Sequence, residues 1–293
     1  MAKSLPFVSV IIPTYHDWDR LRTCITALKA QTYPRNRFEV LIVNNDPDDE
    51  PPELELPGNF RLISESKPGS YAARNKGIRA SQGEILAFTD SDCIPYPDWV
   101  EKAVHNLNAG AERIAGRVEL FYNGGRLTWA EKYEKAYAFR QENKADSGTS
   151  VTANMVTWRP NFEKVGLFDD TFLSGGDLEW GFRANAAGIS ITYAYDSVVQ
   201  HPARRRVRDL LDKRARVAAG AVRIKRPESI RGFLYWLVRG FMPPVYGYMN
   251  IRKRPDLTMN EKLCAFAVLY FIKVYSTCQK LLLMANLKKP KRV

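Results

Sequence analysis

Short apolar runs alternate with amphipathic segments along roughly the first 90 residues of the chain. The apolar runs are continuous rather than alternating, which is typical of strands buried on both faces of a parallel sheet. They occupy residues 7–12, 38–43, 60–63 and 85–88. Helices are expected between them at 19–31 and 69–81, where apolar and small residues recur at helical spacing. This succession predicts one half of a doubly wound α/β domain.

The pattern loosens after about residue 97. Helices are predicted at 99–107, 129–143 and 175–187, and strands at 113–121 and 189–193. Mixed order of this kind is expected of a second half that packs on the first. We therefore expect an α/β fold, Rossmann-like, with a mixed sheet flanked by helices and with halves at 1–95 and 96–203.

The composition changes after Pro202. A basic helix is predicted from Arg204 to about Lys225, followed by apolar stretches at 232–238 and 263–285. The last stretch contains Lys273 and other polar residues, which disfavours a clean membrane span. A helix lying in the membrane interface fits better, while a helical pack, an oligomer contact and a true span stay open. Residues 204–293 are thus expected to form a basic, amphipathic helical extension.

The net charge of +12 is unevenly distributed. Residues 1–201 carry 22 Lys and Arg against 27 Asp and Glu, whereas residues 202–293 carry 22 against 5, a net charge of +17. Such a basic segment indicates a separate anionic partner, either lipid or nucleic acid, or simply a solvated helical surface. The chain has no zinc-ligand spacing, RNP-type motif or DNA-reading element, so nucleic acid is not expected.

The four cysteines have neither CxxC nor disulfide-like spacing, which fits a reducing compartment. The N-terminus leads directly into a short strand without the apolar segment of a signal peptide. Together with the basic extension, these features predict a cytoplasmic protein that is peripheral to the inner face of the membrane.

Two carboxylates, Asp90 and Asp92, follow the apolar run 85–88. Alternation along an extended chain would put both on one side, at the carboxyl end of the strand, where open α/β sheets bind ligands. Carboxylates held this close repel each other unless a cation compensates them. A divalent metal that carries a substrate diphosphate is the expected compensation.

Four motifs now stand in order along the chain. They are Ile12-Pro13-Thr14-Tyr15, Val43-Asn44-Asn45-Asp46, Ala73-Arg74-Asn75-Lys76-Gly77 and Asp90-Ser91-Asp92. This order resembles that of family 2 glycosyltransferases, which are inverting enzymes of the GT-A fold. The resemblance continues through residues 158–169 and 175–183 and covers about 200 residues. It implies that residues 1–203 are a GT-A catalytic domain, with a nucleotide-sugar-binding half at 1–95 and an acceptor half at 96–203.

The resemblance also implies a set of donor-binding residues. These are Pro13, Thr14, Tyr15, Asn45, Arg74, Asp90, Ser91 and Asp92. Asn45 stands where such enzymes often place an Asp against the nucleobase, so UDP, GDP and dTDP all stay open as the nucleotide. Arg74 is expected to face the diphosphate, or else to be a solvated helix residue. Asp92 and His201 are expected to bind Mn²⁺ or Mg²⁺, although a lone histidine can be purely structural.

On the acceptor side, Asp177 aligns with the general base of the family. Gly176 replaces the Glu that normally precedes this base, which is a departure from the family's pattern. Glu179 and Trp180 are expected to bind the acceptor, but Glu179 can instead serve the start of its helix, and the ring of Trp180 can instead belong to the core.

The implied activity is that of a glycosyltransferase of the hexosyltransferase type (EC 2.4). It would move a sugar from a nucleoside diphosphate to a hydroxyl of a polysaccharide or a lipid-linked glycan by inverting single displacement. One alternative is a non-catalytic protein of the same fold that binds nucleotide sugar or an anionic polymer. A nucleotidyltransferase would need a Gly-rich triphosphate loop after the first strand, and Pro13-Thr14-Tyr15 is not one.

Overall fold

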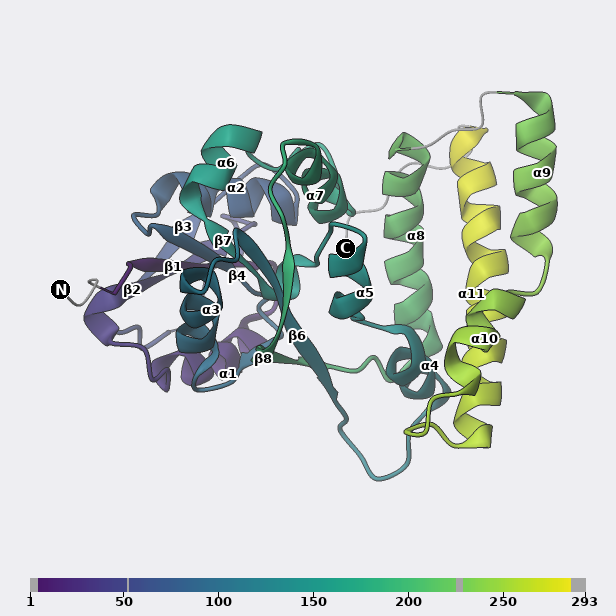
Figure 1. Ribbon diagram of the computed structural model, residues 1–293, viewed down its shortest axis with the longest axis horizontal. Helices are drawn as coiled ribbons and strands as arrows, with labels where there is room; N and C mark the ends of the chain where they lie inside the picture. Colours follow the sequence, from purple (N-terminus) through teal and green to yellow (C-terminus); the bar gives the residue numbers. More distant parts are fainter. Residues whose placement is uncertain (1–4, 52, 225–228, 286–293) are drawn as a thin grey trace. The chain divides into compact units, whose positions relative to one another are not determined.

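The structure, a computed structural model, describes residues 5–51, 53–224 and 229–285 and includes an eight-stranded mixed sheet (Figure 1). The strand order across the sheet is β3-β2-β1-β4-β7-β6-β8-β5. The strands are β1 (Val8–Thr14), β2 (Phe38–Asn44), β3 (Phe60–Ser64), β4 (Ile85–Phe88), β5 (Ile94–Pro95), β6 (Arg113–Phe121), β7 (Met155–Trp158) and β8 (Thr192–Pro202). The predicted α/β class with a mixed sheet is confirmed.

The first four strands of this order are mutually parallel. Val8 in β1 pairs in register with Phe38 of β2 and with Ile85 of β4. Every residue of β1, β2 and β4 is buried, which explains why their sequences are apolar without alternation. Because these strands are parallel, their carboxyl ends lie at one edge of the sheet, and the residues that follow them meet there. The other half is antiparallel, with β7 pairing β4 and β6, and β5 pairing β8.

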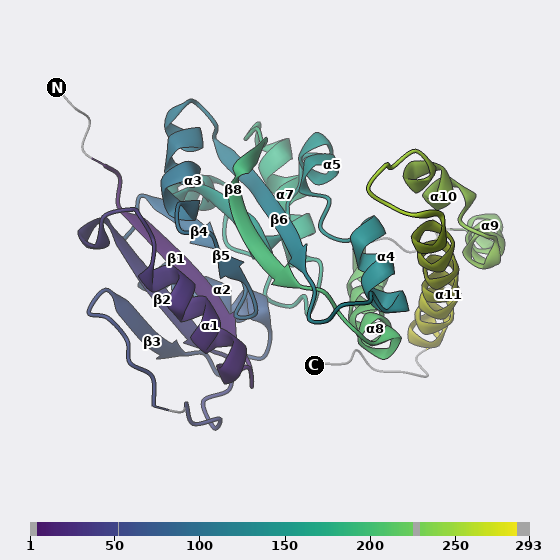
Figure 2. The ribbon, with the colours of Figure 1, turned by 90° about the horizontal axis from the view of Figure 1, so that it is seen from below.

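Helices cover both faces of the sheet (Figure 2). One face packs against α1 (Trp18–Lys29) and α3 (Trp99–Asn108). The opposite face packs against α2 (Ser70–Ala80), α6 (Arg159–Val165) and α7 (Gly176–Ala186). The result is a three-layer arrangement in which α2 and α7 share one face.

Gly77 allows α2 to approach the sheet closely. A Cβ atom at this position would lie 2.5 Å from Cγ2 of Ile11 in β1. We expect Gly77→Ala to lower the free energy of unfolding by about 1 to 2 kcal/mol, because overpacking outweighs the better helix propensity of Ala. The matched control is Gly58→Ala, since nothing lies within 4 Å of a Cβ atom there. Equal unfolding midpoints for the two variants in urea would contradict this packing.

The chain divides into two compact units by its contacts. The sheet and its helices form one unit, which comprises residues 1–119, 139–172 and 176–201. Because the sequence predicts the catalytic residues here, we call it the catalytic unit. The helical unit comprises residues 120–138, 173–175 and 202–293. The boundary that the sequence placed at 203 therefore lies close to the break after His201. Residues 120–138, however, were assigned to the catalytic domain and instead group with the C-terminal helices.

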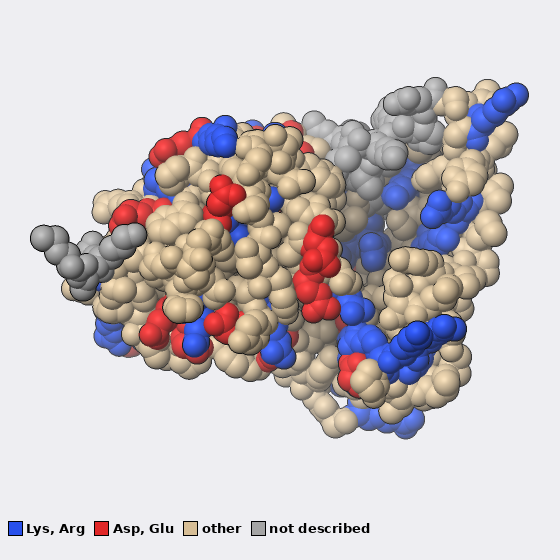
Figure 3. All heavy atoms as spheres, viewed as in Figure 1, with Lys and Arg blue, Asp and Glu red and all other residues tan. Residues whose placement is uncertain are grey.

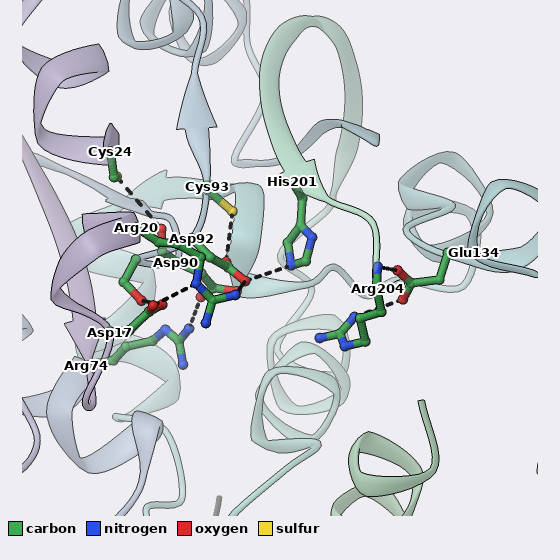
Figure 4. Close-up of polar contacts among 11 residues, drawn as sticks. Asp17, Arg20, Cys24, Arg74, Asp90, Asp92, Cys93, Glu134, His201 and Arg204 are labelled. Atoms are coloured by element: carbon green, nitrogen blue, oxygen red, sulfur yellow. Dashed lines mark hydrogen bonds and ion pairs between the residues drawn. The ribbon is translucent and has the colours of Figure 1, made fainter. Parts of the chain in front are cut away.

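The helical unit contains α4, α8, α9, α10 and α11. Their bounds are Trp129–Tyr137, Val207–Ile224, Ile230–Phe241, Val245–Arg252 and Met259–Met284. Tyr133 of α4, Leu210 of α8 and Val268 of α11 share one apolar core. The buried carboxylate of Glu134 accepts hydrogen bonds from the backbone and side chain of Arg204, at 2.6 and 2.8 Å (Figure 4). These contacts explain why α4 belongs to this unit.

Two sequence expectations need correction. The single helix expected at 129–143 is broken, because α4 ends at Tyr137 and α5 spans Gln141–Asp146. Phe139 in the break has φ = 49°, a left-handed conformation that no helix interior contains. The strand expected at 189–193 is instead β8, which begins at Thr192 and continues to Pro202. The predicted end of α8 near Lys225 lies outside the described residues. Short 3₁₀ turns at Arg35–Arg37 and Thr152–Asn154 lead directly into β2 and β7.

Candidate active site

The Asp90–Asp92 motif follows β4 at the carboxyl edge of the parallel strands. Strand β4 ends at Phe88, and residues 91–92 form a turn in which the amide of Cys93 donates to the carbonyl of Asp90 at 3.1 Å. The expected alternation along an extended chain is therefore not the local geometry. The turn nevertheless leaves both carboxylates in one cluster of polar side chains (Figure 4).

Arg74 pairs with the first carboxylate. Its Nη2 donates to Oδ1 of Asp90 at 2.5 Å, and the side chain is only 4% exposed. The alternative of a solvated helix residue is thereby excluded. Nε of Arg74 is buried and has no hydrogen-bond partner among the described residues. A buried cation with an unused N–H at the end of a parallel sheet suits an anionic ligand, because guanidinium N–H groups match phosphate oxygens well.

Asp92 lies between two basic side chains. Its Oδ2 is 3.5 Å from Nη1 of Arg20 and 3.5 Å from Nε2 of His201. Arg20 also donates to Asp17 through Nε at 2.6 Å (Figure 4). The carboxylate of Asp92 is thus held by charge at the point where the sequence placed a metal ligand.

A metal ion fits the donor atoms at this point. Ligand atoms of Asp92, Cys93 and His201 all lie within 4.8 Å of one another. Burial, and next the charge of Asp92, raise the pKa of the Cys93 thiol well above its usual value, so the thiol stays protonated and is a poor ligand. A carboxylate and an imidazole remain, and this pair suits Mn²⁺ when substrate oxygens complete the shell.

His201 is brought to Asp92 by the full length of β8 and is buried. Its ring packs on Phe139, with the ring centroids 4.4 Å apart. Phe139 reaches this position through its left-handed backbone in the break between α4 and α5. The two corrected elements, the long strand and the broken helix, therefore both position this histidine.

The predicted nucleobase and ribose residues lie where β1 and β2 end. Pro13 and Thr14 close β1, and the buried Oγ1 of Thr14 has no hydrogen-bond partner among the described residues. The partly exposed ring of Tyr15 meets His16 edge-on, with centroids 4.2 Å apart. Ser91 donates to Asp17 at 3.1 Å, so its hydroxyl supports the turn itself. Thr14 and Tyr15 therefore remain suited to ligand contact.

Asn45, directly after β2, is buried and contacts the loop before α2. Its amide nitrogen donates to the carbonyls of Glu65 and Lys67 at 3.0 and 2.8 Å, and its Oδ1 accepts from the amide of Gly69 at 2.7 Å. These bonds engage both N–H groups and the oxygen with the loop before α2. Asn45 therefore shapes this loop, and its contact to the nucleobase stays a prediction.

Asp177 stands in the first turn of α7. Its Oδ1 accepts from the hydroxyl of Tyr71 at 3.0 Å and from the amide of Leu178 at 2.9 Å. No partner for Oδ2 is recorded in the described part of the chain. The carboxylate is thus held by one oxygen, and the other can accept a proton.

The two residues expected to bind the acceptor have structural partners instead. Glu179 makes two hydrogen bonds to Arg183 one turn later, at 2.6 and 2.9 Å. Trp180 is fully buried, stacks on Phe162 and donates to the carbonyl of Gly166. Trp180 as an acceptor platform is therefore wrong, because its ring belongs to the core between α6 and α7. The Arg183 pair gives Glu179 a structural role as well.

Sequence reasoning did not identify Tyr71, Arg20 and Asp17. Tyr71 is three residues before Arg74 in a helix, so helical spacing alone would have placed it on the same face as that arginine. Arg20 and Asp17 carry no comparable signal, since acidic and basic residues are common at a helix start.

Comparisons with known proteins identify the family and the fold of this chain. The model of the family described as Glycosyl transferase family 2 matches residues 9–164. Glycosyltransferase AglE of Haloferax volcanii is 35% identical over 295 residues, which cover 96% of this chain and 95% of that protein. Putative glycosyltransferase EpsH of Bacillus subtilis is 36% identical over 101 residues, 33% of this chain and 27% of that protein.

Among solved structures, the mannosyltransferase PcManGT from Pyrobaculum calidifontis, in complex with GDP-Man and Mn²⁺, has the same fold. The TM-score is 0.61 at 16% sequence identity, over 98% of this chain and 89% of that chain. The fold is therefore GT-A, as expected from the order of the motifs. The family model matches more than half of this chain, and AglE aligns with nearly all of it. The chain therefore belongs to glycosyl transferase family 2.

Proposed function

We propose that this transferase moves a hexosyl group from a nucleoside diphosphate sugar to an acceptor hydroxyl, with a divalent metal and inversion at the anomeric carbon. The observation that carries the proposal is the cluster of Asp92, His201 and the Arg74–Asp90 pair at the carboxyl ends of the parallel strands. It combines metal-ligating atoms with a buried cation, and both suit the negative charge of a diphosphate.

The donor's diphosphate would lie against Arg74, whose buried Nε still lacks a partner among the described residues. Asp92 and His201 would hold Mn²⁺ or Mg²⁺, which when bound supplies Lewis-acid stabilisation of the charge that grows on the leaving diphosphate. Thr14 and Tyr15 are proposed to contact the nucleoside. The solved complex of PcManGT with GDP-Man and Mn²⁺ supports this class of donor and metal, while UDP and dTDP remain candidates beside GDP.

Asp177 is the proposed general base. Its Oδ2 would take the proton from the acceptor hydroxyl as that oxygen attacks the anomeric carbon from the side opposite the diphosphate. A single displacement with inversion is preferred, because the resemblance to inverting enzymes implies it and this course needs no covalent intermediate.

The proposal is tested by incubating the purified protein with UDP-, GDP- and dTDP-hexoses, Mn²⁺ and candidate glycan acceptors, while following the released nucleoside diphosphate. Proton NMR of the product reads the anomeric configuration. Release from one nucleotide class, with an inverted product, supports the proposal. Binding of the donor without turnover on any glycan would favour the alternative of a non-catalytic nucleotide-sugar-binding protein.

The helical unit is proposed to bind an anionic membrane surface, at the inner face of the membrane. On the face that Figure 3 shows, blue Lys and Arg side chains gather over this unit, with few red Asp or Glu side chains among them. Exposed apolar residues recur at helical spacing in α9, and α10 carries further exposed apolar residues. They are Ile230, Leu234, Val238, Phe241, Val245 and Met249. An apolar stripe beside basic side chains is the pattern of a helix lying in the membrane interface.

A cavity of about 350 Å³ between α8, α9 and α11 adds to this argument. Arg214, Arg239, Lys273 and Lys280 line it, and its described lining residues include no carboxylate. Burial, and next the charge of a neighbouring arginine, lower the pKa of both lysines. An anionic headgroup would relieve this crowding of positive charge. If the acceptor is a lipid-linked glycan, the membrane surface that the helical unit binds would also carry the acceptor.

Helix α11 has the length and mean hydropathy, 1.3, of a possible membrane span, the one such helix among the described residues. The core helix of a soluble protein can meet the same criterion, and α11 also packs on α4 and α8. We therefore place α11 within the helical unit and assign the membrane contact to the exposed apolar residues of α9 and α10.

Charge reversal in the cavity is expected to weaken membrane binding. Arg239→Glu combined with Lys280→Glu should reduce co-sedimentation with vesicles of phosphatidylglycerol and phosphatidylcholine by about tenfold or more, since each basic residue near such a surface contributes about 1 kcal/mol. The control is Arg22→Glu with Arg79→Glu, an equal change in net charge on exposed positions of the catalytic unit. Equal losses for both pairs, or no binding of the wild-type protein, would contradict the assignment.

A further inference from the structure

Tyr71 and Gly176 fit against each other in the catalytic unit. Tyr71 in α2 is only 5% exposed, and its ring lies over the first residue of α7. A Cβ atom built on Gly176 would be 2.9 Å from both Cδ2 and Cε2 of that ring. Real Cβ contacts are essentially never that short, so Tyr71 in its present position excludes any side chain at 176.

The hydroxyl of Tyr71 reaches the next residue, Asp177. It donates to Oδ1 at 3.0 Å, and the amide of Leu178 donates to the same oxygen at 2.9 Å. Two donors on one oxygen fix the rotation of the carboxylate, because its plane is then held from two directions. Oδ2 of Asp177 has no hydrogen-bond partner among the described residues. It is consequently held in one orientation.

Tyr71 stays a donor under all ordinary conditions. Burial, and next the negative charge of Asp177, hold the pKa of the Tyr71 hydroxyl far above its usual value. The phenol therefore keeps its proton and cannot compete with the carboxylate as a base. This feature distinguishes it from a neighbouring carboxylate, which would add a second negative charge beside Asp177.

The ring of Tyr71 also has a fixed neighbour on the donor side of the site. The guanidinium carbon of Arg74 lies 5.5 Å from the ring centroid, in the range of a cation–π contact. Arg74 in turn holds Asp90. Tyr71 thus contacts both the arginine proposed to bind the diphosphate and the carboxylate proposed to accept the proton.

We propose that Tyr71 is a positioning residue for the base Asp177, and that Gly176 is required because the Tyr71 ring fills the space of its missing side chain. This inference rests on the proposed role of Asp177. It accounts for the glycine that stands beside this aspartate, since the hydroxyl of Tyr71 supplies the second donor on Oδ1 and leaves Oδ2 for the acceptor.

The first test is Tyr71→Phe, which keeps the ring against Gly176 and removes only the hydroxyl. We expect kcat for sugar transfer to fall about 10- to 100-fold, the effect of one hydrogen bond to a charged group. The KM of the donor should not change. Calorimetry with the nucleoside diphosphate gives the fraction of competent sites, so partial misfolding cannot imitate the loss of kcat. A kcat per competent site equal to that of the wild type would overturn the proposal.

The second test is a double-mutant cycle of Gly176→Ala and Tyr71→Ala. With Tyr71 present, Gly176→Ala should lower kcat per competent site about tenfold or more, because the new Cβ displaces the ring and its hydroxyl. With Tyr71→Ala as background, the same substitution should change kcat by less than about twofold, since the space is then available. Equal losses in both backgrounds would contradict the pairing.

The outcomes separate this inference from the function on which it rests. If Asp177→Asn keeps full activity, the assignment of the base itself is wrong. If Asp177→Asn is inactive while Tyr71→Phe matches the wild type, Asp177 remains the base and only the role of Tyr71 is refuted.

Discussion

Asp177→Asn is expected to reduce sugar transfer by about 10²- to 10⁴-fold, the usual contribution of a general base. The amide keeps the shape of the side chain, and its carbonyl oxygen can still accept from Tyr71 and from the amide of Leu178. It cannot take a proton from the acceptor. Nucleoside diphosphate binding should remain as in the wild type, because the donor residues are untouched. Initial rates of diphosphate release at saturating donor measure the effect.

Glu163→Gln provides the control for Asp177→Asn. Glu163 is an exposed carboxylate on α6 of the same unit, and we expect its variant to match the wild type. If Asp177→Asn retained more than about a tenth of the wild-type rate, another group would have to accept the proton, and the proposed mechanism would be refuted.

Asp92→Ala is expected to abolish the dependence of donor binding on the metal. The variant removes the carboxylate that faces His201 and Arg20, each at 3.5 Å, and leaves the imidazole as the one proposed ligand. We expect transfer to fall by about 10³-fold or more, because Arg74 alone would then compensate the charge on the leaving diphosphate. Titration with Mn²⁺ should not restore the rate, whereas it should restore wild-type protein that has been treated with EDTA.

The matched control for Asp92→Ala is Asp19→Ala. Asp19 is an exposed carboxylate in the first turn of α1, so its removal changes the net charge equally without touching the cluster. Its rate and its response to Mn²⁺ should equal those of the wild type. Full Mn²⁺-dependent activity of Asp92→Ala would show that the metal is held elsewhere.

The parallel half of the sheet was predictable because burial of a strand on both faces produces a recognisable local sequence pattern. The continuous apolar runs at β1, β2 and β4 follow directly from strands that have no solvated side. The resemblance to the family also implied that Arg74 would face the diphosphate, and the structure pairs this arginine with Asp90.

The remaining parts of the site depend on contacts between distant segments. Whether Trp180 stacks on Phe162 or faces a ligand is decided by the packing of α6 on α7, which no local pattern records. The break at Phe139 and the extension of β8 to His201 are likewise visible only when the two meet. Asn45 looks like a ligand-binding residue in sequence, but the loop at 65–69 uses its hydrogen bonds.

The departure at Gly176 has the same origin. The sequence alone indicates only that Gly176 lacks the carboxylate that usually stands beside the base. In the structure a residue more than 100 positions earlier, Tyr71, fills that space and donates to Asp177. The contact between Tyr71 and Gly176 depends on both residues together, so neither sequence segment alone predicts it.

Calorimetric titration of the wild-type protein with UDP, GDP and dTDP, with and without Mn²⁺, is the most direct test of the central claim that the cluster at Asp92 is a metal-dependent nucleoside diphosphate site. We expect one of the three to bind at a stoichiometry of about one, with the binding lost on removal of the metal. Absence of binding by all three in the presence of Mn²⁺ would contradict the claim.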